Sequence, residues 1–119
     1  MKKIKAIFID VRSKEISEIE IENELDSYYR LIKCDCITAP SFDEKHDVIV
    51  DDEGLLKDIE GFFEVDSECP GEYAGNGLIV GVNSNGDWTS HHLNFEEVKK
   101  HIHFITYVRF NGQIVKIRL

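Results

Sequence analysis

The dipeptide Asn111-Gly112 constrains the fold more than any other feature of the sequence, because it is the chain's strongest signal for a tight β-hairpin. The stretches on either side of it are rich in β-branched and aromatic residues, which favour strands. A two-residue loop also fixes the pairing register, starting with Phe110 opposite Gln113. The sequence therefore predicts two antiparallel strands at this point, Phe104–Phe110 and Gln113–Leu119.

Side chains of a strand alternate between two faces, so the predicted hairpin has two distinct surfaces. One surface, which we call the apolar face, is predicted to lie in the core; it comprises Phe104, Thr106, Val108, Phe110, Val115, Ile117 and Leu119. The other surface, which we call the cationic face, comprises Ile105, Tyr107, Arg109, Ile114, Lys116 and Arg118.

The cationic face combines three basic side chains with a tyrosine, which makes it a candidate half-site for a nucleotide-like ligand. A guanidinium group presents a planar fork to phosphate oxygens, and a tyrosine ring offers a flat surface to a base. The alternative is that these cations are solvated, or pair with carboxylates elsewhere in the chain. The sequence leaves both interpretations open.

The charge of the chain is unevenly distributed. The formal net charge is −9, and all 23 acidic residues lie at or before Glu97. The first 97 residues hold nine basic residues, whereas the last 22 hold five and no acid. The acidic balance disfavours nucleic-acid polymers and anionic membranes as partners. The C-terminus is therefore the place where a small anion would bind most favourably.

Length and composition fit one globular domain over residues 1–119, with 42% hydrophobic and 31% charged residues. No apolar run approaches the roughly 18 residues that span a membrane, and the basic N-terminus is not followed by the apolar stretch of a signal peptide. The three cysteines, Cys34, Cys36 and Cys69, are an odd number, which argues against a secreted disulfide framework. These features predict a protein of the bacterial or host-cell cytoplasm.

The sequence patterns predict an α+β fold with a mostly antiparallel sheet and two packed helices, in the order β-β-α, several short strands, then α-β-β. Besides the hairpin, strands are expected at Ile4–Val11, Glu15–Glu22, Cys34–Ala39, Asp47–Val50, Leu78–Val82 and Trp88–Thr89. Loops are expected at Ser41–Lys45 and Asp66–Gly77, and the stretch Leu55–Val65 is left open between strand and turn.

Two helices are predicted from apolar periodicity and capping residues. The first runs from about Glu24 to Lys33 with Asn23 as its N-cap, and its inner face is Leu25, Tyr28 or Tyr29, and Ile32. The second follows Asn94, with Glu97 placed to complete a capping box; its inner stripe is Phe95, Val98 and Ile102.

The other chemical groups do not form a recognisable catalytic or metal motif. The five histidines and the Cys34-x-Cys36 pair lack standard zinc spacing. No nucleophile elbow and no phosphate-binding glycine loop occurs. We therefore expect no enzyme activity, no metal and no cofactor. Trp88 is expected in the core or at an interface more than as a stacking platform.

Two stretches resemble a known family. These are the opening, IKAIFIDVRSKEISEIEIENELDSYYRLIKCD, and the segment GLIVGVNSNGDW followed by a helix at Asn94; together they cover roughly residues 2–103. They resemble the phage anti-Thoeris sponge proteins, type one. The resemblance implies a homo-oligomer, without catalysis, that sequesters cyclic ADP-ribose isomers or related cyclic nucleotide signals in the bacterial host and so prevents activation of a defence effector.

The resemblance also implies roles for particular residues. The family uses arginines on phosphates and aromatic rings on adenine. Arg109 is the best match, Arg30 is a second cation, and Tyr107 or Trp88 would stack on the base. An alternative function is an acidic, protein-binding inhibitor or accessory protein of a phage or mobile element. A small hydrolase acting on the same nucleotide is a third possibility.

Overall fold

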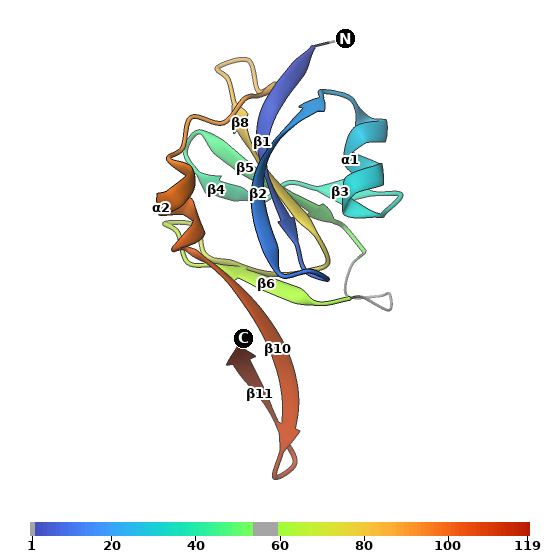
Figure 1. The fold of residues 1–119 in the computed structure, drawn as a ribbon, viewed down its shortest axis with the longest axis vertical. Helices are drawn as coiled ribbons and strands as arrows, with labels where there is room; N and C mark the ends of the chain where they lie inside the picture. Colours follow the sequence, from blue (N-terminus) through green and yellow to red (C-terminus); the bar gives the residue numbers. More distant parts are fainter. Residues whose placement is uncertain (1, 54–59) are drawn as a thin grey trace.

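A computed structural model describes residues 2–53 and 60–119, which form two antiparallel sheets and two helices (Figure 1). The larger sheet has the strand order β2-β1-β8-β5-β3, with β4 added to β5 and β9 added to β8. Its strands are β1 (Lys3–Asp10), β2 (Glu15–Glu22), β3 (Ile37–Thr38), β4 (Ser41–Asp43), β5 (His46–Asp51), β8 (Gly77–Val82) and β9 (Trp88–Thr89).

The smaller sheet has the order β11-β10-β6-β7. Its strands are β6 (Phe62–Val65), β7 (Gly71–Ala74), β10 (Ile102–Phe110) and β11 (Gln113–Arg118), and the helices are α1 (Leu25–Ile32) and α2 (Phe95–Lys99). Every strand pairing within the described ranges is antiparallel. The predicted α+β class, with mostly antiparallel strands and two helices, is therefore confirmed.

The central strand β8 explains the layering, because it is buried on both faces. Leu78 and Val80 point towards α1, whose Tyr28 and Ile32 pack in the same cluster. Ile79 points the other way, into a cluster formed with α2 and the smaller sheet; its members from these elements are Phe63, Val65, Val98 and Ile102. A strand that is buried on both faces has a nearly continuous run of apolar residues in its sequence, and β8 has such a run.

The two sheets approach closely where β8 begins. A Cβ atom on Gly77 would lie 2.5 Å from the Phe63 ring, so the ring occupies the space that a side chain would need. Phe63 is itself fully buried. Close packing of the smaller sheet on the larger one therefore depends on glycine at this position.

The first helix begins differently from the prediction. The N-cap is Glu24, not Asn23, and it makes no side-chain capping bond within the described structure. Asn23 instead donates to the Trp88 carbonyl at 2.8 Å and accepts from the Tyr28 hydroxyl, so its amide ties the helix to β9. Leu25, predicted on the inner face, is 53% exposed. The side chains that α1 buries are Ser27, Tyr28 and Ile32.

The second helix matches its predicted cap but is shorter than expected. Asn94 accepts a hydrogen bond from the backbone N–H of Glu97 at 3.1 Å, as predicted. The Glu97 carboxylate, expected to complete a capping box, lies 3.2 Å from the Lys100 Nζ instead. Because α2 ends at Lys99, the predicted stripe residue Ile102 is the first residue of β10.

Two predictions around Pro40 are wrong in detail. Of the predicted strand Cys34–Ala39, only Ile37–Thr38 forms a strand. The predicted loop Ser41–Lys45 contains β4, because Ser41 pairs with Asp47 across a bulged ladder.

The chain between β5 and β8 also holds more strand than predicted. The loop expected at Asp66–Gly77 contains β7, whose residues pair with β6 throughout. The open stretch Leu55–Val65 ends in β6. The part of that stretch at residues 54–59 lies outside the described residues.

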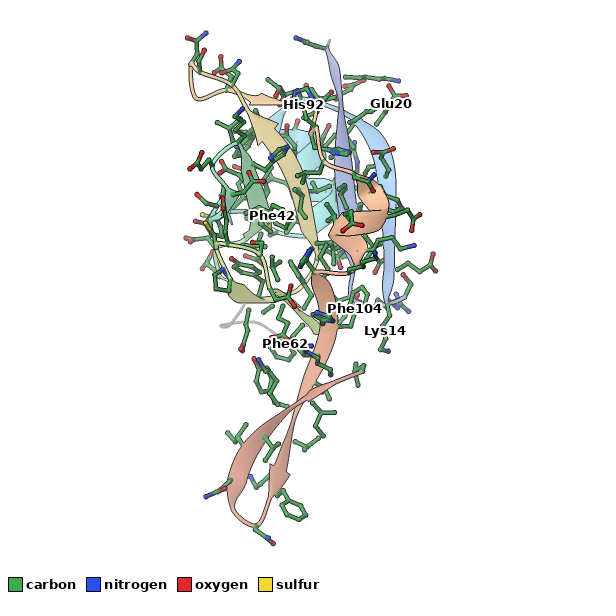
Figure 2. The ribbon with its side chains drawn as sticks, turned by 90° about the vertical axis from the view of Figure 1, so that its left-hand side faces the viewer. Lys14, Glu20, Phe42, Phe62, His92 and Phe104 are labelled. Atoms are coloured by element: carbon green, nitrogen blue, oxygen red, sulfur yellow. The ribbon has the colours of Figure 1, made fainter. Side chains whose placement is uncertain are left out.

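The C-terminal hairpin extends beyond the body of the protein (Figure 1). Figure 2 shows Phe62 and Phe104 at the base of the hairpin, where it leaves the body. The molecule is accordingly elongated, with extents of 51 × 29 × 24 Å. Along the described chain, no helix is long and apolar enough to cross a membrane.

The prediction that the apolar face lies in the core is wrong for most of its members. Phe104 packs against the core cluster, but the side chains further along are exposed. The exposed members are Val108, Phe110, Val115, Ile117 and Leu119. They lie on the hairpin, which extends beyond the body, and no described part of the same chain buries them.

Candidate functional site

The hairpin has the register that the sequence predicts. Phe110 pairs with Gln113, and Tyr107 pairs with Lys116. The turn residues Asn111 and Gly112 have positive φ angles of 51° and 80°, as a two-residue hairpin loop requires. The cationic face is therefore assembled with the expected register.

Two of the three hairpin cations are bound by the protein's own carboxylates. The Lys116 Nζ lies 2.7 Å from Glu64 Oε2 and 2.8 Å from Glu72 Oε2. The Arg118 Nε lies 2.6 Å from Glu64 Oε1. The Glu64 side chain is only 9% exposed, and hydrogen bonds from Lys116 and Arg118 keep the pKa of its carboxyl below the ordinary value. Lys116 and Arg118 thus neutralise a carboxylate that would otherwise be buried unpaired.

Tyr107 belongs to the same network. Its hydroxyl donates to the Glu72 carboxylate, and its ring meets the Phe62 ring edge-on, with centroids 5.0 Å apart. The bond to Glu72 raises the pKa of the Tyr107 hydroxyl. Hydrogen bonds from Lys116 and Tyr107 lower the pKa of Glu72. The tyrosine is therefore held by the protein rather than presented as an open stacking surface.

Asp66 continues the network at the base of the hairpin. His101 Nδ1 lies 2.7 Å from Asp66 Oδ1, and His103 Nε2 lies 3.1 Å from Oδ2. These two hydrogen bonds lower the pKa of Asp66. An Arg118 nitrogen lies 4.0 Å from the same carboxylate. Sequence reasoning missed this group because Asp66 falls in a segment predicted as loop.

Arg109 is the exception among the hairpin cations. Its side chain is exposed, and within the described ranges no hydrogen bond or ion pair joins its guanidinium group to another residue. Its nearest neighbours along the cationic face are the partly exposed Tyr107 and, across the ladder, Ile114, which is 69% exposed. An anion that approaches the hairpin would therefore meet one available guanidinium group.

A second candidate site is an acidic hollow of about 570 Å³ beside β4. Four carboxylate residues line it: Asp43, Glu44, Asp66 and Glu68. Lys45, His46 and His101 are among the other lining residues. The Glu44 backbone N–H donates to Glu68 at 3.2 Å, which joins the two segments that form the walls. No sequence motif indicates this site, because its acids come from segments far apart in the chain.

Comparison with known proteins gives one match. Residues 4–103 match a family described as a domain of unknown function, DUF3846. The chain belongs to the DUF3846 family. No curated protein and no solved structure matches it.

The DUF3846 region contains the acidic hollow but ends where the hairpin begins. Arg109, Lys116 and Arg118 lie beyond residue 103, so they are outside the part of the chain that the family description covers. The resemblance to sponge proteins covers nearly the same residues, roughly 2–103. Because the family has no assigned function, sequestration of a cyclic nucleotide remains a prediction.

Two other predicted ligand residues lie within the DUF3846 region but away from the hairpin. Trp88 donates from Nε1 to Asp47 at 3.1 Å and meets the Tyr28 ring edge-on at 5.1 Å. Arg30 is exposed on α1, which covers the face of the larger sheet opposite the smaller sheet. In a single copy, neither residue joins Arg109 and Tyr107 in one pocket.

Two histidines of the DUF3846 region have structural bonds on both ring nitrogens. His46 Nδ1 lies 2.9 Å from Asp43, and its Nε2 accepts from the His92 N–H at 3.1 Å. In His91 the roles are reversed: Nε2 lies 2.6 Å from Glu18, and Nδ1 accepts from the Leu93 N–H at 3.1 Å. Within the described chain, no group of three potential metal ligands occurs.

Proposed function

We propose that this DUF3846 protein is a non-catalytic binding protein that captures a basic surface of another protein. The observation that carries the proposal is the acidic hollow of about 570 Å³, which is lined by Glu44 and Glu68 as well as by two carboxylates that histidines already hold, Asp43 and Asp66. A lysine or arginine side chain from a partner fits that volume and charge. The partner class that follows is a protein with a basic, phosphate-binding surface, for which the acidic protein acts as a mimic.

The state of the hairpin cations supports this choice over a phosphate site. Lys116 and Arg118 serve three carboxylates, Glu64, Glu72 and Asp66. An anionic ligand would have to displace these carboxylates, and one of them, Glu64, is nearly buried. Leaving a buried charge without its partner is costly. The surplus charge of the protein is thus acidic, in line with its net charge of −9.

The test is binding of a fluorescent oligolysine peptide, followed by fluorescence anisotropy. The Glu44→Gln, Glu68→Gln double variant removes two charges from the hollow, while the amide at position 68 can still accept the bond from residue 44. The control, Glu15→Gln with Glu20→Gln, removes two exposed charges from β2. Losing two contacts of about 0.5–1 kcal/mol each weakens binding by roughly tenfold in the hollow variant.

The control variant should lose less than about twofold, since distant exposed charges are screened. Equal weakening in both double variants would show that only the overall charge matters, and would remove the hollow from the proposal. Binding that is insensitive to salt would also contradict it.

A second candidate is the sponge for a cyclic nucleotide signal, acting in a bacterial cytoplasm. It is favoured by the exposed, unpaired guanidinium of Arg109 beside Tyr107. Thermal unfolding against cyclic ADP-ribose isomers and cyclic oligonucleotides tests it, because a ligand at 100 times its Kd stabilises the fold by about 2.7 kcal/mol. A shift that Arg109→Ala abolishes and Arg12→Ala retains would support the sponge; a flat panel would exclude it for those ligands.

A further inference from the structure

We infer that the apolar face of the C-terminal hairpin is the surface through which two copies of this chain form a dimer. The face runs from the base of the hairpin, where Leu119 lies opposite Phe104, to the tip at Phe110. Its exposed fractions are 38% for Val108, 66% for Phe110, 40% for Val115, 41% for Ile117 and 64% for Leu119. It contains no charged residue, in a chain of which 31% is charged.

The composition of this face is that of a protein core. The inner end of the same face, Ile102 and Phe104, packs against the main hydrophobic cluster. Apart from Thr106, hydrophobic residues continue on this face to the tip and back along β11 to Leu119, whose N–H donates to the Phe104 carbonyl at 2.9 Å. Contiguous exposed apolar patches of this kind mark interaction sites. Most of this face is therefore apolar surface that a single copy leaves exposed to water.

The cover that the protein itself offers is another hairpin. Beyond the hairpin, the large hydrophobic residue exposed in the described structure is Leu25, on α1. The body of a second copy therefore offers acidic side chains and isolated apolar residues. Its hairpin offers an apolar face of the same kind. Pairing the same patch on both copies gives a closed two-fold interface.

The hairpins meet face to face rather than edge to edge. Strand β11 is at the edge of its sheet, so two β11 strands could pair through their backbones. That arrangement would leave the apolar faces of both copies exposed. Stacking the faces, at about the 10 Å spacing of packed sheets, buries them.

Electrostatics are compatible with this stacking. The cations Arg109, Lys116 and Arg118 point to the other side of the hairpin, and carboxylates within the same copy already hold the last two. The apolar faces carry no charge of their own. The remaining repulsion is between two whole copies of net charge −9 each. Salt screens that repulsion, so the dimer is stronger at high ionic strength.

The experiment is sedimentation equilibrium of the full chain and of single-residue variants, without any added peptide or nucleotide. We expect the wild type to have twice the mass of the 13.7 kDa chain. Val115→Lys and Phe110→Lys place a charge in the stacked face and should weaken the dimer by about 100-fold or more. Ile114→Lys is the matched control, because Ile114 adjoins Val115 but lies on the cationic face.

A monomeric wild type at the highest soluble concentration would overturn the inference. So would equal dissociation by Val115→Lys and Ile114→Lys, or a dimer that weakens as salt is added. Circular dichroism checks the fold, and Phe110→Lys, at the tip of the hairpin, serves if Val115→Lys fails to fold. The sedimentation experiment contains no oligolysine, so a monomeric result would not contradict peptide binding by the hollow. A failure of peptide binding would likewise not contradict the dimer.

Discussion

The two halves of β10 follow the same alternating pattern and lie in different surroundings. In the inner half, Ile102 packs into the main cluster and Ile105, on the cationic face, is 1% exposed. In the outer half, Val108 and Phe110 are exposed. Alternation therefore separates the two faces of a strand, although both are covered in the inner half of β10. It does not identify the molecule that provides the cover.

The largest effect expected from this comparison separates two isoleucines on the cationic face. Ile105→Ala removes a buried side chain and should lower the free energy of unfolding by about 2–5 kcal/mol. Ile114→Ala, at a side chain that is 69% exposed, should change it by less than about 0.5 kcal/mol. Urea denaturation followed by Trp88 fluorescence measures both. Similar losses in the two variants would mean that the outer hairpin is covered in solution through this face.

The next effect concerns the ion pairs that link the inner half to β6. Glu64→Gln removes the charge that Lys116 and Arg118 share, and should lower the free energy of unfolding by about 1–2 kcal/mol. Glu96→Gln is the matched change at an exposed pair, where the Lys99 Nζ lies 3.9 Å away, and should cost less than about 0.5 kcal/mol. An unchanged midpoint for Glu64→Gln would show that the network adds no net stability.

The same ion-pair network should make the stability of the wild-type chain depend on pH in the acidic range. The pKa values of Glu64, Glu72 and Asp66 are all below their ordinary values of 4.5, 4.5 and 3.8. Stability from carboxyls with lowered pKa values is complete above those ordinary values and is lost as pH falls below them. Urea midpoints measured from neutral pH downwards should therefore decline below about pH 4.5, and less steeply in Glu64→Gln. Parallel declines in the two proteins would contradict this assignment.

The smallest effect is expected at the tip. Gly112 has φ +80°, a conformation that costs other residues about 1 kcal/mol. Gly112→Ala should accelerate amide hydrogen exchange in the outer hairpin and leave exchange in β8 unchanged. Faster exchange throughout the chain would show that the outer hairpin unfolds together with the body rather than separately.

The features that the sequence predicted correctly depend on residues close together in the chain. The hairpin register follows from Asn111-Gly112, and the cap of α2 follows from Asn94. Asn23 has the same side chain, but its amide is occupied by the Trp88 carbonyl and the Tyr28 hydroxyl. Such a long-range competition leaves no trace in the local pattern, so the cap of α1 was predicted wrongly.

The candidate sites were harder to predict, because they depend on segments that do not look like strands. The partners of the hairpin cations, Glu64 and Glu72, lie in stretches predicted as ambiguous and as loop. Gly71 and nearby glycine and proline residues conceal β7. The possibility that the cations pair within the chain could be stated from the sequence. The identity of their partners required the tertiary structure.

The bonds of Lys116 have a mechanical consequence. This lysine is on β11, at one edge of the smaller sheet, and Glu72 is on β7, at the other edge. A single ammonium group can join both edges only because the sheet is strongly curled. Since β10 alone carries the backbone from the body into the outer hairpin, Lys116 acts as a brace that fixes the angle of this arm. The distance between the two bodies of a dimer would then depend on the bonds of Lys116 and its neighbours to Glu64 and Glu72, and acidification would let that distance vary.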